Sequence, residues 1–204
     1  MQPQVVVVGA GFGGLAAVDG LADAPVDVTL VDRNNFHTFQ PLLYQVATAG
    51  LASADVAYPV RGIVRRHANV TFRQASVIGA DLDARILHLQ GAGHEVSDVG
   101  YDHLILAAGA VTNTFGIAGV AQHGFPLYSL GDAVRLRNHL LERFEAAAAD
   151  PSLIRNMVQE IIRVPELARV PMTPPTMLGL ANLRGEILPV FELRKMLGVA
   201  AQER

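Results

Sequence analysis

Residues 4–32 carry a hydrophobic pattern typical of a strand–helix–strand unit. Four consecutive valines follow Gln4, as expected for a strand buried on both faces of a parallel sheet. Leu15, Val18 and Leu21 then recur at helical spacing, and residues 27–32 form a second apolar run. The segment has the length of a βαβ crossover and predicts the start of an α/β fold with a parallel sheet.

The pattern after this unit is mixed. Pro41 is suited to begin a helix, and residues 59–66 suit a short one. We expect strands at 70–77, 85–90 and 103–107, with a hairpin turn at 91–93. Ser129 and Asp132 have capping-box spacing and predict the start of an amphipathic helix that runs to Ala149.

The composition changes near Asp150 and Pro151. Six of the 11 prolines follow residue 150. Residues 1–150 hold 9 arginines, no lysine and 14 acidic residues, a net charge of −5, whereas residues 151–204 hold 7 basic and 5 acidic residues, a net charge of +2. Short strands at 178–183 and 187–193, joined at 184–186, have hairpin spacing. We predict two domains, 1–149 and 150–204.

Composition excludes several classes of function. The chain is 50% hydrophobic and 17% charged, with a net charge of −3, so neither disorder nor nucleic-acid binding is expected. It contains no cysteine, which rules out a disulfide framework, a cysteine nucleophile and a thiolate zinc site within these residues. The 7 histidines show no ligand spacing, and we predict no metal site.

No run of residues approaches the ~20 apolar positions of a membrane helix, so no transmembrane segment is predicted. The first four residues carry no basic charge, and we read no signal peptide. A cytoplasmic protein is the expectation, with peripheral contact at the inner face of the membrane left open.

The sequence Gly9-Ala10-Gly11-Phe12-Gly13-Gly14 is the strongest chemical signal. It follows a predicted strand and opens a predicted helix, which is the context in which this glycine spacing binds a dinucleotide. The first glycine permits the tight turn, the second lets the backbone approach a pyrophosphate, and the third lets helix and strand pack. The helix N-terminus then offers amide donors to the phosphates. The alternative is a glycine-rich turn without a ligand.

Asp32 ends the second strand, 18 residues after Gly14. A carboxylate there can accept hydrogen bonds from both ribose hydroxyls of an adenosine, and it disfavours a 2′-phosphate, so FAD or NAD fits better than NADP. Arg33 beside it weakens that preference. The alternative is an acidic residue at a solvated strand end.

Two further segments suit a cofactor site. Residues 36–50 place His37, Gln40, Tyr44 and Gln45 among apolar residues, where they could line a flavin ring or form an ordinary loop with core aromatics. The strand at 104–107 ends in a turn at Ala108 and Gly109 that could let backbone approach a cofactor. The Gly-Asp pair at 131–132 is instead interpreted as part of the helix cap.

Residues 1–149 resemble the N-terminal part of type II NADH dehydrogenases, single-chain NADH:quinone oxidoreductases that use FAD. The resemblance rests on residues 5–14, 30–50, 57–62, 101–110 and 129–144, which occur in family order; the run Gln40-Pro-Leu-Leu-Tyr-Gln45 is the most specific. It implies a Rossmann-type FAD-binding domain with inserted β-strands. It further implies FAD phosphate contacts at Gly9–Gly14.

The same resemblance implies roles for residues elsewhere in the domain. Asp32, with Arg33 beside it, would take the adenosine ribose, and the backbone of Val77 would contact the adenine. Ala108 and Gly109 would form the turn near the flavin, and the loop at 41–48, which includes Gln45, would approach its ring. The family's second glycine-rich unit, which binds NADH, does not follow residue 149 in this sequence, so we expect little or no NADH oxidation by the chain alone.

Residues 158–199 resemble part of a CheW-like domain, the adaptor that couples chemoreceptors to a histidine kinase. The run Asn182-Leu-Arg-Gly-Glu-Ile-Leu-Pro-Val190 carries the resemblance. It implies a partial all-β segment with Asn182, Arg184 and Gly185 at the partner-binding turn; a solvated hairpin is the alternative.

Three hypotheses therefore stand. The first is an FAD-dependent oxidoreductase of the NADH:quinone kind, truncated and fused to the CheW-like segment, with quinone as its partner. The second is an adaptor that binds a chemoreceptor or histidine kinase. The third is a non-functional fusion fragment.

Overall fold

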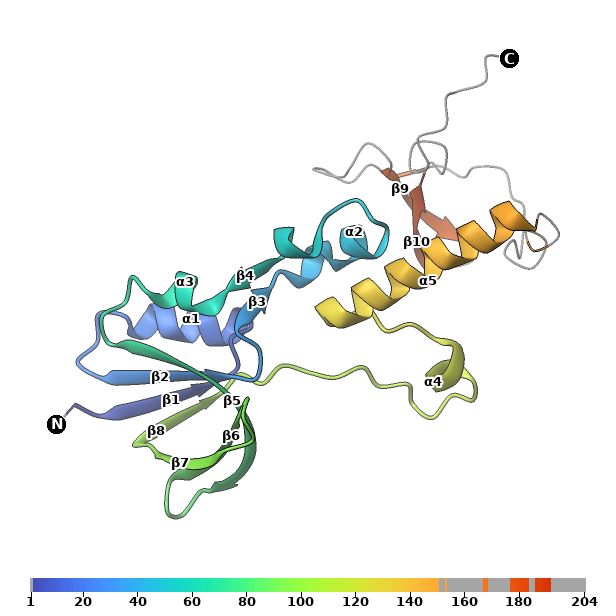
Figure 1. Ribbon diagram of the computed structural model, residues 1–204. Helices are drawn as coiled ribbons and strands as arrows, with labels where there is room; N and C mark the ends of the chain where they lie inside the picture. The colour runs from blue at the N-terminus through green and yellow to red at the C-terminus, as the bar shows by residue number, and fades with distance from the viewer. Residues whose placement is uncertain (1, 151–152, 154–166, 169–176, 184–185, 192–204) are drawn as a thin grey trace.

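The computed structural model describes residues 2–150, 153, 167–168, 177–183 and 186–191 (Figure 1). Its centre is a six-stranded sheet in the order β7-β6-β5-β2-β1-β8. The first and second strands pair in parallel, and β8 and β5 add in parallel on either side. The strands are β1 (Gln4–Val8), β2 (Asp27–Asp32), β5 (Val70–Asp81), β6 (Ile86–Gly91), β7 (Val96–Gly100) and β8 (His103–Leu106).

The valine run forms the middle of this sheet because each of its faces is covered. Val5 and Val7 point to the side where helices α1 (Phe12–Leu21) and α3 (Val60–Val64) pack. Val6 points to the other side, where it packs with Leu87 and Leu89 of β6. All of these side chains are buried. Because successive side chains of a strand point to opposite faces of the sheet, β1 contributes to an apolar layer on each face. The α/β fold class predicted from the sequence is confirmed.

The segment between β2 and β5 builds a second, smaller core beside the sheet. Strands β3 (Phe36–Thr38) and β4 (Ala57–Pro59) pair antiparallel and lead into the short helices. Leu43 and Val46 of α2 (Leu43–Ala47) pack with Ala133 of α5 (Leu130–Ala149). Two 3-10 turns, η1 (Gln40–Leu42) and η2 (Ser53–Asp55), complete this layer.

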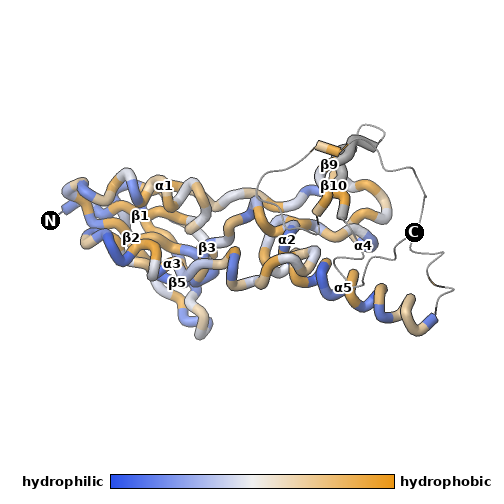
Figure 2. Tube along the Cα trace, turned by 90° about the horizontal axis from the view of Figure 1, so that it is seen from above, coloured by the Kyte–Doolittle hydropathy of each residue, from blue (hydrophilic) through white to orange (hydrophobic). Residues whose placement is uncertain are grey.

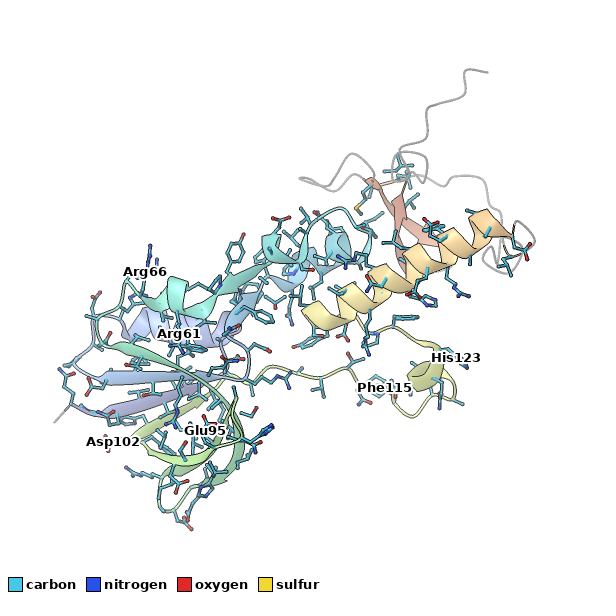
Figure 3. All side chains as sticks on the ribbon, in the orientation of Figure 1. Arg61, Arg66, Glu95, Asp102, Phe115 and His123 are labelled. Carbon is cyan, nitrogen blue, oxygen red and sulfur yellow. The ribbon has the colours of Figure 1, made fainter. Side chains whose placement is uncertain are left out.

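A long connection joins β8 to α5 and carries one short helix, α4 (Val120–His123). Its apolar side chains are exposed: Val111 is 83% and Phe115 is 82% accessible. Figure 3 shows Phe115 and His123 on this connection, away from the sheet. Coloured by hydropathy, the tube shows apolar stretches in this connection as well as in the sheet (Figure 2). We call residues 107–129 the connecting segment.

The C-terminal part contributes a hairpin of β9 (Met177–Leu183) and β10 (Glu186–Phe191). The two strands pair antiparallel, and Ala168 forms an isolated bridge to Leu180. The hairpin predicted for this region is therefore present. Residues 192 and 193 of its predicted second strand lie outside the described residues.

Several boundaries differ from expectation. The strand predicted at 70–77 continues to Asp81, because the β6 strand pairs with it over its whole second half. The next strand begins at Ile86 instead of Arg85, since Arg85 adopts a left-handed φ of 54° in the turn. Residues 33–68, expected to be irregular outside their helices, include the β3–β4 pair.

In the described part of the chain, no helix has both the length and the apolar character needed to cross a membrane.

Candidate functional site

The bend between β1 and α1 is built around two glycines that no other residue could replace without a shift. Gly9 has a φ of +103°, and a Cβ there would lie 2.2 Å from the carbonyl oxygen of Ala107. A Cβ on Gly14 would lie 1.7 Å from the carbonyl oxygen of Gly9. The bend therefore fits tightly between the end of β8 and the first turn of the helix, as the sequence predicted for Gly9 and Gly14.

Gly11 differs from these two glycines because it faces open space. No other atom lies within 4 Å of the position its Cβ would occupy. No side chain caps α1, and its first turn holds no acidic residue. The first amides of a helix have no partner within the helix, and they carry partial positive charge. The backbone at Gly11–Gly13 can thus be approached by an anionic ligand.

Two side chains anchor the bend from outside it. The amide of Ala10 donates to Oδ2 of Asp32 at 2.6 Å, and Asp32 Oδ1 accepts from the amide of Asn34 at 2.7 Å. The carbonyl oxygen of Ala10 lies 2.9 Å from Nδ1 of His37, which is buried. Since each carboxylate oxygen has about two acceptor sites, Asp32 can hold the bend and still accept a ribose hydroxyl.

A cleft of about 740 Å³ opens at the carboxyl ends of β1, β2 and β8. Ligands of open α/β sheets bind at this edge. Asp32 and Arg33 are its only charged lining residues in the described part of the chain. Its remaining lining comes from the ends of β1 and β2, from the bend, from β3 and η1, from β5, from the turn after β8 and from the residues just before α5: Val8–Gly13, Val31, Asn34, Phe36, Thr38, Gln40, Ala75–Val77, Ala107–Val111, Tyr128 and Ser129.

Most of the predicted cofactor residues meet in this cleft. These are Gly9, Ala10, Gly11, Phe12, Gly13, Asp32, Arg33, Val77, Ala108 and Gly109. Gly14 lies behind the bend, where it allows close packing. Gln45 is buried beside Tyr44, to whose hydroxyl its amide donates at 2.9 Å, and it does not line the cleft. A contact between Gln45 and a flavin stays a prediction.

Val77 lines the cleft next to an irregularity in β5. The pairing register shifts between Val77 and Gly79, so Ile78 is an extra residue on this strand. Such a bulge bends the strand and often re-aims the backbone beside a binding site. The bulge lies where the resemblance places the adenine.

Sequence reasoning missed Tyr128, which organises the far end of the cleft. Its hydroxyl accepts from the amide of Ala110 at 3.1 Å, next to Gly109 with its φ of +76°. Its carbonyl oxygen accepts from the side-chain amide of Gln40 at 3.1 Å. Tyr128 thus forms hydrogen bonds with residues that lie 18 and 88 positions away in the chain. The sequence near residue 128 carries no pattern that would predict these contacts.

The helix cap beside Tyr128 matches expectation. Ser129 accepts from the amide of Asp132, and the Asp132 carboxylate accepts from the amide and hydroxyl of Ser129. Burial alone would raise the pKa of Asp132, but these hydrogen bonds, with one from Tyr128, hold that pKa below its ordinary value. Asp132 therefore belongs to the start of α5.

The predicted partner-binding turn is only partly described. Asn182 lies in β9, opposite Ile187 of β10. Arg184 and Gly185 lie outside the described residues. No group of three or more histidine and acidic side chains arranged to hold a metal ion occurs in the part of the chain that the structure describes.

Two models of known protein families match this chain. Residues 3–158 match the model of the pyridine nucleotide-disulphide oxidoreductases. The chain belongs to that family. Residues 155–204 match the model of the CheW-like domain. Both resemblances expected from the sequence are therefore confirmed.

Members of the type II NADH:quinone oxidoreductases are among the similar proteins. The enzyme Ndh of Mycobacterium tuberculosis is 39% identical over 150 residues, which cover 72% of this chain and 32% of that protein. NdhA of the same organism is 41% identical over 148 residues, covering 71% and 30%. The chain thus spans about a third of the length of these relatives.

Solved structures with the same fold include NDH2 from Plasmodium falciparum in complex with NADH. It is 24% identical, covers 72% of this chain and 30% of its own, and has a TM-score of 0.64. Sulfide:quinone oxidoreductase from Aquifex aeolicus is 23% identical, covers 73% and 33%, and has a TM-score of 0.62. These likenesses concern the fold.

Proposed function

We propose that the cleft binds FAD and that the chain is the FAD-binding part of an NADH:quinone oxidoreductase. The observation that carries this proposal is the glycine bend, which opens a helix at the carboxyl edge of a parallel sheet. The relatives named as type II NADH:quinone oxidoreductases, 39% and 41% identical over 150 and 148 residues, support the same proposal. FAD, NADH and quinone are the cofactor and substrates that the proposal requires.

The described residues fit an adenine dinucleotide. Gly11 leaves open space where a side chain would otherwise stand, so a diphosphate can reach the helix amides. Asp32 stands at the end of the adjacent strand, as needed for a ribose. The cleft volume of about 740 Å³ is within the range of small-molecule sites, roughly 300–1,000 Å³.

Each part of the cleft has a distinct task in this proposal. The amides of Gly11–Gly13 bind the diphosphate, Asp32 accepts from the ribose, and the bulged backbone at Val77 borders the adenine. The turn at Ala108 and Gly109, braced by Tyr128, lies toward the flavin ring. When bound, FAD supplies a ring that exchanges electrons with substrates, and the protein supplies binding and orientation.

Titration of the purified chain with FAD, followed by calorimetry, tests the proposal. We expect saturable binding by the wild type. Gly11→Ala adds one methyl group to the cleft and should weaken FAD binding about tenfold or more. Gly20→Ala, on the exposed side of the same helix, is the control that should bind FAD like the wild type. Failure of the wild type to bind, or unchanged affinity in Gly11→Ala, would contradict the proposal.

Addition of NADH to the FAD-loaded chain tests a separate point. We expect slow or no bleaching of the flavin absorbance, because these residues include no second glycine-rich βαβ motif. Rapid and complete bleaching would contradict that expectation without affecting FAD binding. Peripheral attachment at the inner face of a membrane also stays a prediction.

A second candidate function rests on the C-terminal segment. Residues 155–204 match the CheW-like model, and β9–β10 form an antiparallel hairpin there. We propose that the turn at Asn182, Arg184 and Gly185 binds a chemoreceptor or a histidine kinase. A pull-down with the wild type and with Arg184→Glu tests this: loss of the partner in the variant supports it, and no kinase or receptor recovered with either form counts against it.

A further inference from the structure

His37 is a buried polar residue that does not line the cleft but contacts the bend beside it. It lies in the middle of β3, opposite Tyr58 of β4, and its ring packs edge-on against Phe12 with centroids 5.0 Å apart. Its Nδ1 lies 2.9 Å from the carbonyl oxygen of Ala10, 27 residues away. A carbonyl oxygen can only accept, so Nδ1 carries the hydrogen and donates it.

The backbone of the bend is held by partners on successive peptide groups. Gly9 donates its amide to the carbonyl of Val31 at 2.7 Å. Ala10 donates its amide to Asp32. The following peptide group, between Ala10 and Gly11, has its carbonyl fixed by His37. These contacts determine the orientation of the backbone just before the helix begins.

The orientation of that last peptide group decides where the Gly11 amide points. In a planar trans peptide the carbonyl and the amide hydrogen point in opposite directions. With the Ala10 carbonyl turned toward the buried imidazole, the Gly11 amide turns away from it, and Gly11 lines the cleft. A glycine-rich backbone can adopt many conformations. Fixing the Ala10 carbonyl restricts them at the peptide group that carries the Gly11 amide.

We infer that His37 is a positioning residue that presets the diphosphate-binding amides through the Ala10 carbonyl. This inference deepens the proposed function and rests on it for the identity of the ligand. His37 itself need not touch the ligand. Preset donors bind more tightly because less conformational freedom is lost on binding.

Two substitutions separate the hydrogen bond from the packing. His37→Phe keeps a ring against Phe12 but removes the donor. His37→Asn loses the ring but can place an amide donor where Nδ1 stands. We expect hydrogen exchange of the Gly9 and Ala10 amides, whose acceptors are Val31 and Asp32, to rise about tenfold in the ligand-free His37→Phe variant and to stay near the wild-type rate in His37→Asn. Exchange in β6 and β7 is the internal control and should not change.

Ligand affinities complete the test. In His37→Phe the affinities for FAD and for ADP should fall together, about tenfold, while that for adenosine, which has no diphosphate, should stay unchanged. His37→Asn should restore both. An equal loss for adenosine, unchanged exchange at the Gly9 and Ala10 amides, or no rescue by His37→Asn would overturn the inference.

Failure of the proposed function would be recognised separately. If the wild type binds neither FAD nor ADP, the proposed function is wrong, and the exchange data still decide whether His37 holds the bend. If His37→Phe does not fold, the 15N spectrum of the wild type decides: a protonated Nδ1 on His37 supports the inference, and an unprotonated Nδ1 overturns it.

Discussion

The βαβ unit and the connecting segment are both rich in apolar side chains, but only the first buries them. Leu30 of β2 is 0% exposed, whereas Phe115 of the connecting segment is 82% exposed. In the unit, α1 and α3 cover one face of the strands and β6 residues cover the other, so most of the apolar strand positions are buried. The connecting segment lies on no sheet, and in the described part of the chain its apolar side chains stay largely accessible. The βαβ unit therefore contributes most of the free energy of unfolding. The position of the connecting segment is set by its few hydrogen-bonded residues.

The largest expected effect compares one apolar side chain from each region. Leu30→Ala should lower the free energy of unfolding by about 2–5 kcal/mol, because it leaves a cavity in the core. Phe115→Ala should change it by less than about 0.5 kcal/mol, because the ring is already in water. Urea titrations of both variants measure the difference. A loss in Phe115→Ala as large as that in Leu30→Ala would show that the connecting segment is packed.

The second comparison lies within α1. Gly14→Ala should destabilise the protein by about 3 kcal/mol, because the new methyl group meets the Gly9 carbonyl at the bend. Gly20→Ala should stabilise it by about 0.5–1 kcal/mol, because nothing lies near that position and alanine favours a helix. Thermal unfolding of the two variants measures the predicted destabilisation by Gly14→Ala and the predicted stabilisation by Gly20→Ala. Equal effects would mean that the bend does not constrain Gly14.

The cap of α5 gives a smaller effect that depends on pH. The folded pKa of Asp132 is lowered, so its contribution is present above the ordinary value of 3.8 and is lost as pH falls through the folded pKa. Asp132→Asn should cost about 1 kcal/mol at pH 7, and the difference from wild type should shrink as the pH falls below 3.8 and through the lowered folded pKa. Urea unfolding across this range tests it; a difference that grows toward acid would contradict the assignment.

Tyr128 gives the smallest effect. Tyr128→Phe removes the acceptor for the Ala110 amide, and water can partly replace it because Tyr128 is exposed, so a loss of about 0.5 kcal/mol is expected. Tyr58→Phe is the control, since its hydroxyl has no protein partner among the described residues. Thermal unfolding compares the two, and hydrogen exchange at Ala110 should rise in Tyr128→Phe alone.

The predictable part of the molecule is the part whose structure is set by near neighbours in sequence. The valine run, the glycine bend and the Ser129–Asp132 cap each carry a local pattern, and each is found where the pattern predicts. The bend's close fit against Ala107 also follows from its glycines, although its partner strand lies almost 100 residues away.

The rest of the site depends on contacts that leave no local mark. Tyr128 reaches Gln40 and Ala110, and His37 reaches Ala10, across long stretches of chain. For the segment at 36–50 the sequence leaves two interpretations open, a lining for a flavin ring and an ordinary loop with core aromatics. The structure divides the segment: Gln40 lines the cleft, while Gln45 is buried away from it. Only the fold decides which side of such a segment meets the ligand.

Amide chemical shifts of the 15N-labelled protein during FAD titration test the central claim most directly. If the bend binds the diphosphate, the amides of Gly11, Phe12 and Gly13 should move furthest, with Asp32 and Val77 following and β9 unchanged. No movement at residues 11–13, or the largest movement outside the cleft, would contradict the account.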